Sequence, residues 1–193
     1  SDCGIGAVDR LSATGAVVAM MASVPKLVVM GVSGCGKSLV GSLLAQALAV
    51  PFFDADSYHS RANVEKMASG IPLTDDDRAG WLAGLASLIQ DQDSGLVLAC
   101  SALKRTYRER LRAENPQLRI VYLRGDFQTI WARLSRREDH YFNGQAMLES
   151  QFQLLQEPEP DEGAITLDVT DRPESLVRQC LAVLTATAEA PRG

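Results

Sequence analysis

The chain has 193 residues, of which 46% are hydrophobic and 22% charged, and its formal net charge is −5. This length fits one ordinary domain, and the composition excludes a disordered segment or a coiled coil for most of the chain. The acidic balance argues against a protein that binds nucleic acid mainly through electrostatics. The four cysteines and two histidines lack zinc-ligand spacing, and they favour a reduced, cytoplasmic protein.

Residues 1–24 are expected to lie outside the folded domain, as a natural extension or a vector remnant. The domain is expected to span residues 25–190. The apolar core of the first segment, residues 16–22, is far shorter than the roughly 20 residues that a membrane span needs. The residues before it also lack the basic stretch of a secretory signal. No membrane association is therefore expected.

Short apolar runs predict strands, and the segments between them predict helices. The strands are expected at 26–30, 51–54, 95–100, 119–123 and 164–169. The helices are expected at 39–50, 75–90, 102–114, 127–138 and 143–155, with a final helix from Pro173. Thr74 can cap the second of these helices, with Asp77 three residues on. Alternation of this kind predicts a mainly parallel sheet wrapped by helices.

The strongest motif, Gly31-Val-Ser-Gly-Cys-Gly-Lys37-Ser38, matches the phosphate-loop consensus G-x-x-x-x-G-K-[ST] between a strand and a helix. Glycines let the backbone turn its N–H groups toward phosphate oxygens, and the helix N-terminus adds positive charge. Lys37 is expected to reach the β- and γ-phosphates, and the Ser38 hydroxyl to bind Mg²⁺. Cys35 is expected to fill space rather than to act as a nucleophile. The sequence therefore predicts that a nucleoside triphosphate binds through Gly31, Ser33, Gly34, Cys35, Gly36, Lys37, Ser38 and Leu39.

Two carboxylates follow the second predicted strand. If the chain is extended there, Asp54 and Asp56 project to the same side. One can accept the proton of an attacking hydroxyl, while the other orients that hydroxyl or holds Mg²⁺ through water. The sequence does not separate the two roles, and a capped turn is the structural alternative.

Other polar residues point to a small acceptor. On a helix, His59, Asn63 and Lys66 share one face, and their groups suit an acceptor with several hydroxyls and an anionic group. A solvated helix face is the alternative. Ser101 and Lys104 follow the third predicted strand, where ligands bind in open parallel sheets.

The acidic side chain of a Walker B motif is missing from residues 96–99, which weakens a switch or motor NTPase against a small-molecule kinase. The basic residues at 104–112 are interpreted as a solvated helix face. The acidic, proline-broken loop 157–163 is interpreted as a solvated connector rather than a site.

Arg133 and Arg137 lie four residues apart, within an expected helical lid at 133–155. One guanidinium can stack on the nucleotide base, and the other can neutralise charge on the transferring phosphoryl group. Surface arginines near a helix C-terminus are the structural alternative.

Several segments together match one known family. They are the phosphate loop, Asp54-Ala-Asp56, residues 59–78 with Trp81-Leu82, residues 100–104, residues 122–126, Arg133 and Arg137 with residues 140–142, and Gln156-Glu-Pro158. Through these segments, the chain resembles the bacterial-type gluconokinases over about residues 26–185. These are P-loop kinases related in fold to shikimate and nucleoside monophosphate kinases. The phosphate loop is generic, whereas the block 59–78 is specific.

The resemblance implies a three-layer α/β P-loop kinase fold with about five parallel strands, helices on both faces and a small helical lid. It implies transfer of the ATP γ-phosphate to the 6-hydroxyl of D-gluconate, with Mg²⁺, in a cytoplasmic protein that is commonly a homodimer. By resemblance to related lids, Arg133 meets the adenine and Arg137 the phosphates. The candidates for gripping gluconate are Asp56, His59, Asn63, Lys66, Arg78, Ser101 and Lys104.

Three positions depart from the family pattern. Ala55 replaces a glycine between the two aspartates, Ser60 replaces a proline after the histidine, and Gly80 replaces a proline before the tryptophan. The polar groups are intact, so these changes bear on loop stiffness more than on chemistry. The alternatives are a kinase for shikimate or another aldonate, and a nucleotide-binding regulator that is not a kinase.

Overall fold

The computed structural model describes residues 25–136 and 144–189. The expected N-terminal extension, residues 1–24, therefore lies outside the described residues, and so does Arg137. Within the described stretches, no helix is both long and apolar enough to cross a membrane.

Five parallel strands form one sheet in the order β2-β3-β1-β4-β5. The strands are β1 (Lys26–Met30), β2 (Phe52–Asp54), β3 (Leu96–Ala99), β4 (Arg119–Arg124) and β5 (Ile165–Asp168). Each strand agrees with its predicted run to within one residue at either end. The expected parallel sheet is therefore confirmed.

The helices also follow the predicted order. They are α2 (Lys37–Leu48), α3 (Arg61–Ala68), α4 (Asp75–Asp91), α5 (Arg105–Ala113), α6 (Phe127–Leu134), α7 (Gly144–Leu154) and α8 (Pro173–Glu189), with short 3₁₀ turns η1 (Ala55–Tyr58) and η3 (Pro160–Glu162). The helix expected at 39–50 begins and ends two residues earlier, and two other boundaries differ by three residues or more. The helix expected from 102 begins after the extended residue Lys104, and the helix expected to reach 138 ends at Leu134.

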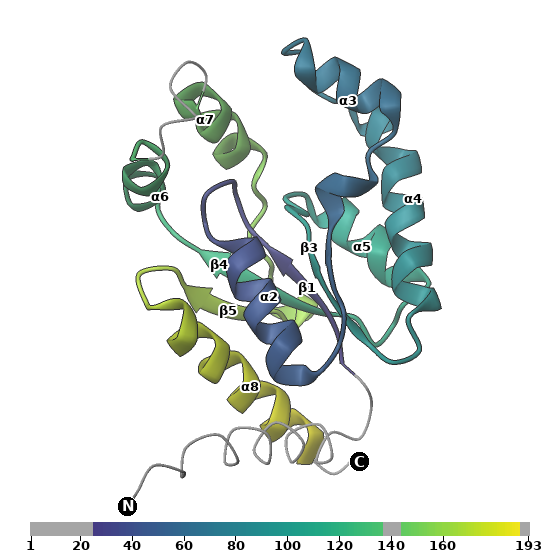
Figure 1. Cartoon of the computed structure of the whole chain (residues 1–193), viewed down its shortest axis with the longest axis vertical. Helices are drawn as coiled ribbons and strands as arrows, with labels where there is room; N and C mark the ends of the chain where they lie inside the picture. The colour runs from purple at the N-terminus through teal and green to yellow at the C-terminus, as the bar shows by residue number, and fades with distance from the viewer. Residues whose placement is uncertain (1–24, 137–143, 190–193) are drawn as a thin grey trace, which may run out of the picture.

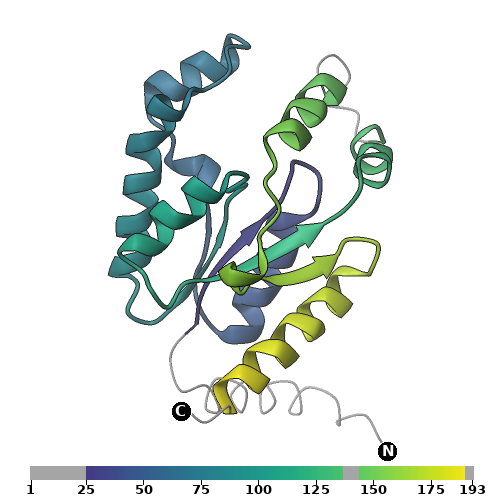
Figure 2. The ribbon, with the colours of Figure 1, turned by 180° about the vertical axis from the view of Figure 1, so that it is seen from behind.

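Helices cover both faces of the sheet, with α2 and α8 on one side and α4 and α5 on the other (Figures 1 and 2). Successive side chains of the central strand β1 point to opposite faces. Leu27 and Val29 pack in the cluster with α2 and α8, whereas Val28 and Met30 pack with α4 and α5. All four are fully buried, as expected for a parallel sheet covered on both faces. The three-layer architecture is thus confirmed.

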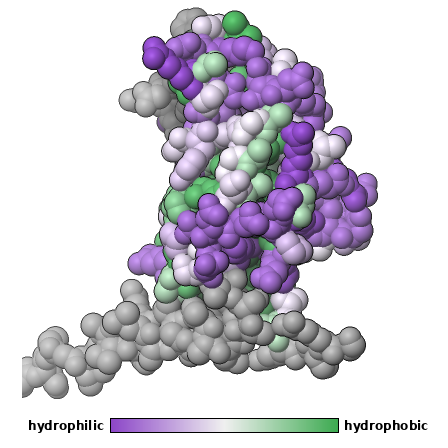
Figure 3. Space-filling model, turned by 90° about the vertical axis from the view of Figure 1, so that its right-hand side faces the viewer, coloured by the Kyte–Doolittle hydropathy of each residue, from purple (hydrophilic) through white to green (hydrophobic). Residues whose placement is uncertain are grey.

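The helices α3 and α7 stand at the end of the sheet where the strands finish (Figure 1). The side of the molecule that carries α3, α4 and α5 is largely hydrophilic, with apolar side chains in narrow strips (Figure 3). This face is typical of a solvated surface.

The interpretation of the basic residues on α5 as a solvated face is wrong at Arg108, which is fully buried. Its Nε and Nη2 atoms donate to the two carboxylate oxygens of Glu162 at 2.6 and 2.8 Å. Arg105 pairs with Asp161 at 2.6 Å. The loop 157–163 is therefore not merely a solvated connector. It neutralises a buried cation, which could not remain in the core without a partner.

We expect Arg108→Met to reduce the free energy of unfolding by about 3–5 kcal/mol, because the Glu162 carboxylate would be left buried and unpaired. Urea unfolding followed by circular dichroism measures this loss. The double variant R108M/E162L should regain most of the lost stability, because it removes both charges. A double variant less stable than R108M would contradict this account.

Candidate active site

The phosphate loop joins β1 to α2 at the carboxyl edge of the sheet. Gly34 has φ +80° and Gly36 has φ +101°, a left-handed conformation that side chains disfavour. A Cβ atom at Gly34 would lie 2.5 Å from Cγ of Leu134, so only glycine fits there. Among the described residues, no side chain caps the first turn of α2. Its N–H groups and the positive end of the helix are therefore suited to phosphate oxygens.

Lys37, the first residue of α2, folds its side chain back over the loop. Its Nζ atom donates to the carbonyl oxygen of Val32 at 3.1 Å. Cys35 is only 2% exposed, and burial raises the pKa of its thiol. A buried, protonated thiol fits the expected space-filling role, because the thiolate is the reactive form. Leu39, by contrast, is an exposed residue in the first turn of α2.

Asp54 and Asp56 have different environments. The chain is not extended after Asp54, because β2 ends there and η1 begins at the next residue. The Oδ2 atom of Asp54 accepts a hydrogen bond from Ser38 Oγ at 3.1 Å, and its Oδ1 atom accepts from the Asp56 backbone N–H at 3.0 Å. Asp54 is thus directed toward the phosphate loop, while the exposed Asp56 does not share this contact.

His59 does not lie on α3 as predicted, because that helix begins two residues later with Ser60 as its N-cap. Its imidazole instead stacks on Trp81, with ring centroids 4.3 Å apart. Burial is the main cause that lowers the pKa of His59; the Asp56 charge opposes this shift, and Arg78 adds to it. Its Nδ1 atom is buried without a hydrogen-bond partner within the described residues. Because this atom is buried, a ligand hydroxyl does not reach it in this conformation.

Asn63 and Lys66 hold α3 against the start of α4. The buried Asn63 donates to the carbonyl oxygen of Asp77 at 2.8 Å, and Lys66 Nζ pairs with the Asp77 carboxylate at 2.7 Å. Asp77 also completes the predicted capping box with Thr74. These two candidate site residues therefore have internal partners. Ser60, a departure from the family proline, accepts from the Asn63 backbone N–H and so starts this helix.

A charged cluster joins the start of α4 to α5. The Asp75 carboxylate accepts a hydrogen bond from the Tyr107 hydroxyl and two from Lys104 Nζ at 2.9 Å. These contacts lower the pKa of Asp75 and raise that of Lys104. Arg78 donates to the Tyr107 hydroxyl at 3.1 Å. Asp75 and Tyr107 are not among the site residues predicted from the sequence, although Tyr107 follows Lys104 by three residues, which is one helical turn.

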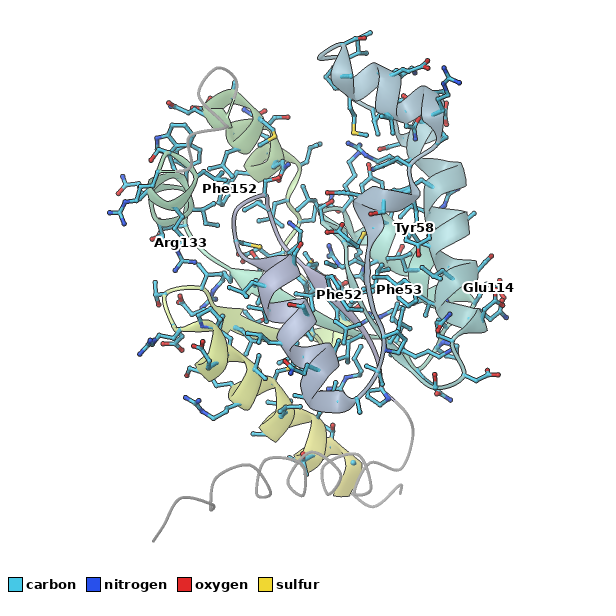
Figure 4. The ribbon with its side chains drawn as sticks, in the orientation of Figure 1. Phe52, Phe53, Tyr58, Glu114, Arg133 and Phe152 are labelled. Carbon is cyan, nitrogen blue, oxygen red and sulfur yellow. The ribbon has the colours of Figure 1, made fainter. Side chains whose placement is uncertain are left out.

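Two other candidates hold neighbouring segments together. The Ser101 carbonyl oxygen accepts from the Gly31 N–H at 3.3 Å, which ties the end of β3 to the phosphate loop. The Arg133 guanidinium, on α6, donates to the Val169 carbonyl oxygen just beyond β5. Figure 4 shows Arg133 at this edge of the molecule. Arg137, the second expected lid arginine, lies outside the described residues.

Comparison with known proteins identifies the family. The family model for shikimate kinase matches residues 33–185. The chain is 47% identical over 161 residues to the thermoresistant gluconokinase of Escherichia coli K12, covering 81% of this chain and 91% of that protein. The chain belongs to the gluconokinase family. The predicted resemblance to gluconokinases is therefore confirmed.

Solved structures agree with this family assignment. A gluconokinase from Sinorhizobium meliloti 1021 superposes with a TM-score of 0.79 at 39% identity, covering 86% of this chain and 94% of that chain. Shikimate kinase from Acinetobacter baumannii superposes with a TM-score of 0.60 at 17% identity, covering 90% of this chain and 99% of that chain. The second likeness supports the fold alone.

We expect Asp77→Asn to reduce the thermal stability of this gluconokinase-family protein at neutral pH more than at low pH. Hydrogen bonds from Lys66 and from the Thr74 backbone lower the pKa of Asp77 from 3.8 to about 2. The contribution of Asp77 is therefore complete above pH 3.8 and is lost as the pH falls toward 2. Thermal melts between pH 2 and 7 measure this, with Asp93→Asn as an exposed control. A difference in Tm that stays constant across this range would contradict the assignment.

Proposed function

We propose that the protein transfers the γ-phosphoryl group of ATP to the 6-hydroxyl of D-gluconate. The observation that carries this proposal is that nucleotide-binding and acceptor-binding groups lie together at one edge of the sheet. The phosphate loop and the Ser38–Asp54 pair form the nucleotide-binding set. Asp56 and His59, which follow Asp54 directly along the chain, form the acceptor-binding set. The gluconokinases among the relatives support gluconate as the acceptor.

Ser38 and Asp54 are suited to hold Mg²⁺. Their oxygen atoms lie 3.1 Å apart beside the phosphate loop, and oxygen is the ligand that Mg²⁺ prefers. When bound, the ion neutralises charge on the phosphates. The loop amides and Lys37 hold the same phosphates from the protein side. Asp54 is therefore assigned to the metal rather than to proton transfer.

Asp56 is the proposed general base. With Asp54 paired to Ser38, the neighbouring exposed carboxylate of Asp56 remains to accept the proton of the attacking hydroxyl. The half-buried imidazole of His59 is proposed to contact another hydroxyl of the sugar acid.

The gluconate carboxylate is assigned to the cationic side of the site. Arg78 makes its hydrogen bond to a neutral hydroxyl, that of Tyr107, whereas Lys104 is already neutralised by Asp75. Arg78 is therefore the preferred partner for the carboxylate, because a guanidinium matches it with two parallel hydrogen bonds. Asn63 and Lys66 then support this site by fixing α3, rather than by gripping the acceptor.

The remaining assignments follow the family. Arg133 is proposed to meet the adenine and Arg137 the phosphates, within a helical lid at 133–155 of a kinase domain that spans 25–190. A lid that closes on both substrates would exclude water from the transfer. A cytoplasmic homodimer is proposed on the same grounds.

We expect D-gluconate to stimulate ADP release from Mg·ATP, and a coupled assay measures this against L-idonate, shikimate, a nucleoside monophosphate and no acceptor. Strong stimulation by gluconate alone would support the proposal. Preference for shikimate or L-idonate would show that the acceptor is a polyol acid other than gluconate. Turnover equal to the blank with every acceptor would contradict kinase activity and favour a nucleotide-binding regulator.

We expect Asp54→Asn and Asp56→Asn to change different kinetic quantities. Asp56→Asn should lower kcat about 10²-fold or more, with ATP affinity nearly unchanged, because it removes only the proton acceptor. Asp54→Asn should raise the Mg²⁺ concentration needed for half-maximal activity. Steady-state kinetics at several Mg²⁺ concentrations separate the two. Equal loss of ATP affinity in Asp56→Asn would instead assign that residue to the metal or to the fold.

A further inference from the structure

One side chain of α7 is hydrogen-bonded to the phosphate loop. The Oε1 atom of Gln151 accepts from the Ser33 backbone N–H at 2.6 Å, and its Nε2 atom donates to Ser33 Oγ at 3.0 Å. The two residues are 118 positions apart in the chain. A carboxamide offers an acceptor and a donor together, so it bonds to the N–H and to the hydroxyl of Ser33 at once.

The next residue of the loop contacts α6. Leu134, at the end of that helix, is buried against Gly34, where an added Cβ atom would lie 2.5 Å from Leu134 Cγ. The two helices are joined to each other by Phe127 and Phe152, whose ring centroids lie 5.7 Å apart. The α6–α7 pair therefore rests on the tip of the phosphate loop, formed by Ser33 and Gly34, through one polar and one apolar contact.

This tip lies near the expected position of the terminal phosphates. The lysine of a phosphate loop, here Lys37, reaches the β- and γ-phosphates of the bound nucleotide. In this structure its Nζ atom donates to the carbonyl oxygen of Val32, the residue before Ser33. Gln151 bonds only to the N–H and hydroxyl of Ser33 among the described loop residues, and the Cys35 N–H donates to the carbonyl oxygen of Val32 at 3.3 Å. The N–H groups of Gly34 and of residues 36–38 are left for phosphate. The contact therefore constrains the loop without blocking it.

We propose that Gln151 is a positioning residue, which holds the tip of the phosphate loop in one conformation for the third phosphate of ATP. A loop that is already ordered loses less conformational entropy when the ligand binds, and donors held in place stabilise the transferring group better. The expected effect of Gln151 on the rate of phosphoryl transfer rests on the proposed function. The expected effect of Gln151 on nucleotide binding can be measured without an acceptor.

The test compares Gln151→Leu with Gln153→Leu, an exposed glutamine on the same helix. Calorimetry measures the affinity of each variant for the ATP analogue AMP-PNP and for ADP, both with Mg²⁺. Loss of the two hydrogen bonds should weaken AMP-PNP binding about tenfold in Q151L. ADP binding should change less than about twofold, because ADP lacks the third phosphate. Q153L should match the wild type for both ligands.

A double-mutant cycle with Ser33→Ala isolates the contact. Because Q151L and S33A remove the same hydroxyl–amide bond, their combined effect on AMP-PNP affinity should be smaller than the sum of the single effects. In the gluconate assay, Q151L should lower kcat about tenfold with little change in the KM for gluconate. Glutamate at this position keeps the acceptor but adds negative charge, so Q151E should bind AMP-PNP more weakly than Q151L.

Three results would overturn the inference. The first is that Q151L binds AMP-PNP as tightly as the wild type does. The second is that the effects of Q151L and S33A on AMP-PNP affinity are additive. The third is that Q151L loses affinity for AMP-PNP and ADP equally and has a lowered Tm, which would indicate a merely structural role. If the wild type fails to phosphorylate gluconate, the proposed function fails. The ratio of AMP-PNP to ADP affinity then still decides the role of Gln151.

Discussion

The site depends on the burial of β1 at the centre of a parallel sheet. The flanking strands β3 and β4 pair with it, and helices cover both of its faces, so its end has a fixed position. Parallel strands finish at the same edge, which brings the ends of β1, β2 and β3 together. The Gly31–Ser101 and Ser38–Asp54 hydrogen bonds are the direct result. The phosphate loop is therefore joined to both neighbouring segments that carry acceptor-side residues.

A second constraint comes from the segment that returns from α7 to β5. Its Glu162 neutralises the buried Arg108, which also donates to the carbonyl oxygens of Ala102 and Leu103. Ala102 has φ +43°, a conformation that costs energy for a residue with a side chain. Gln156 adds two more hydrogen bonds to the same loop. The loop that presents Lys104 is thus held in a strained conformation by partners far along the chain.

The charges around the acceptor side are arranged in internal pairs. Asp75 neutralises Lys104, and Asp77 neutralises Lys66. Of the cations Lys66, Arg78 and Lys104, Arg78 alone has no carboxylate partner among the described residues. Under the proposed function, Arg78 would meet the carboxylate of the sugar acid, and the half-buried His59 would meet one of its hydroxyls. Ion pairs within the protein therefore reduce the number of candidate substrate-binding residues below the number that residue types alone suggest.

The strands, the phosphate loop and the capping box at Thr74 were all determined by the sequence alone, because each depends on neighbours within a few residues. The position of His59, the burial of Arg108 and the contact of Gln151 with Ser33 were decided only by the tertiary structure. Arg108 and Glu162 are 54 positions apart, and Gln151 and Ser33 are 118 apart, so no local pattern reports either contact. Local periodicity predicts elements, but only packing determines which polar groups are paired within the fold and which are left to bind a ligand.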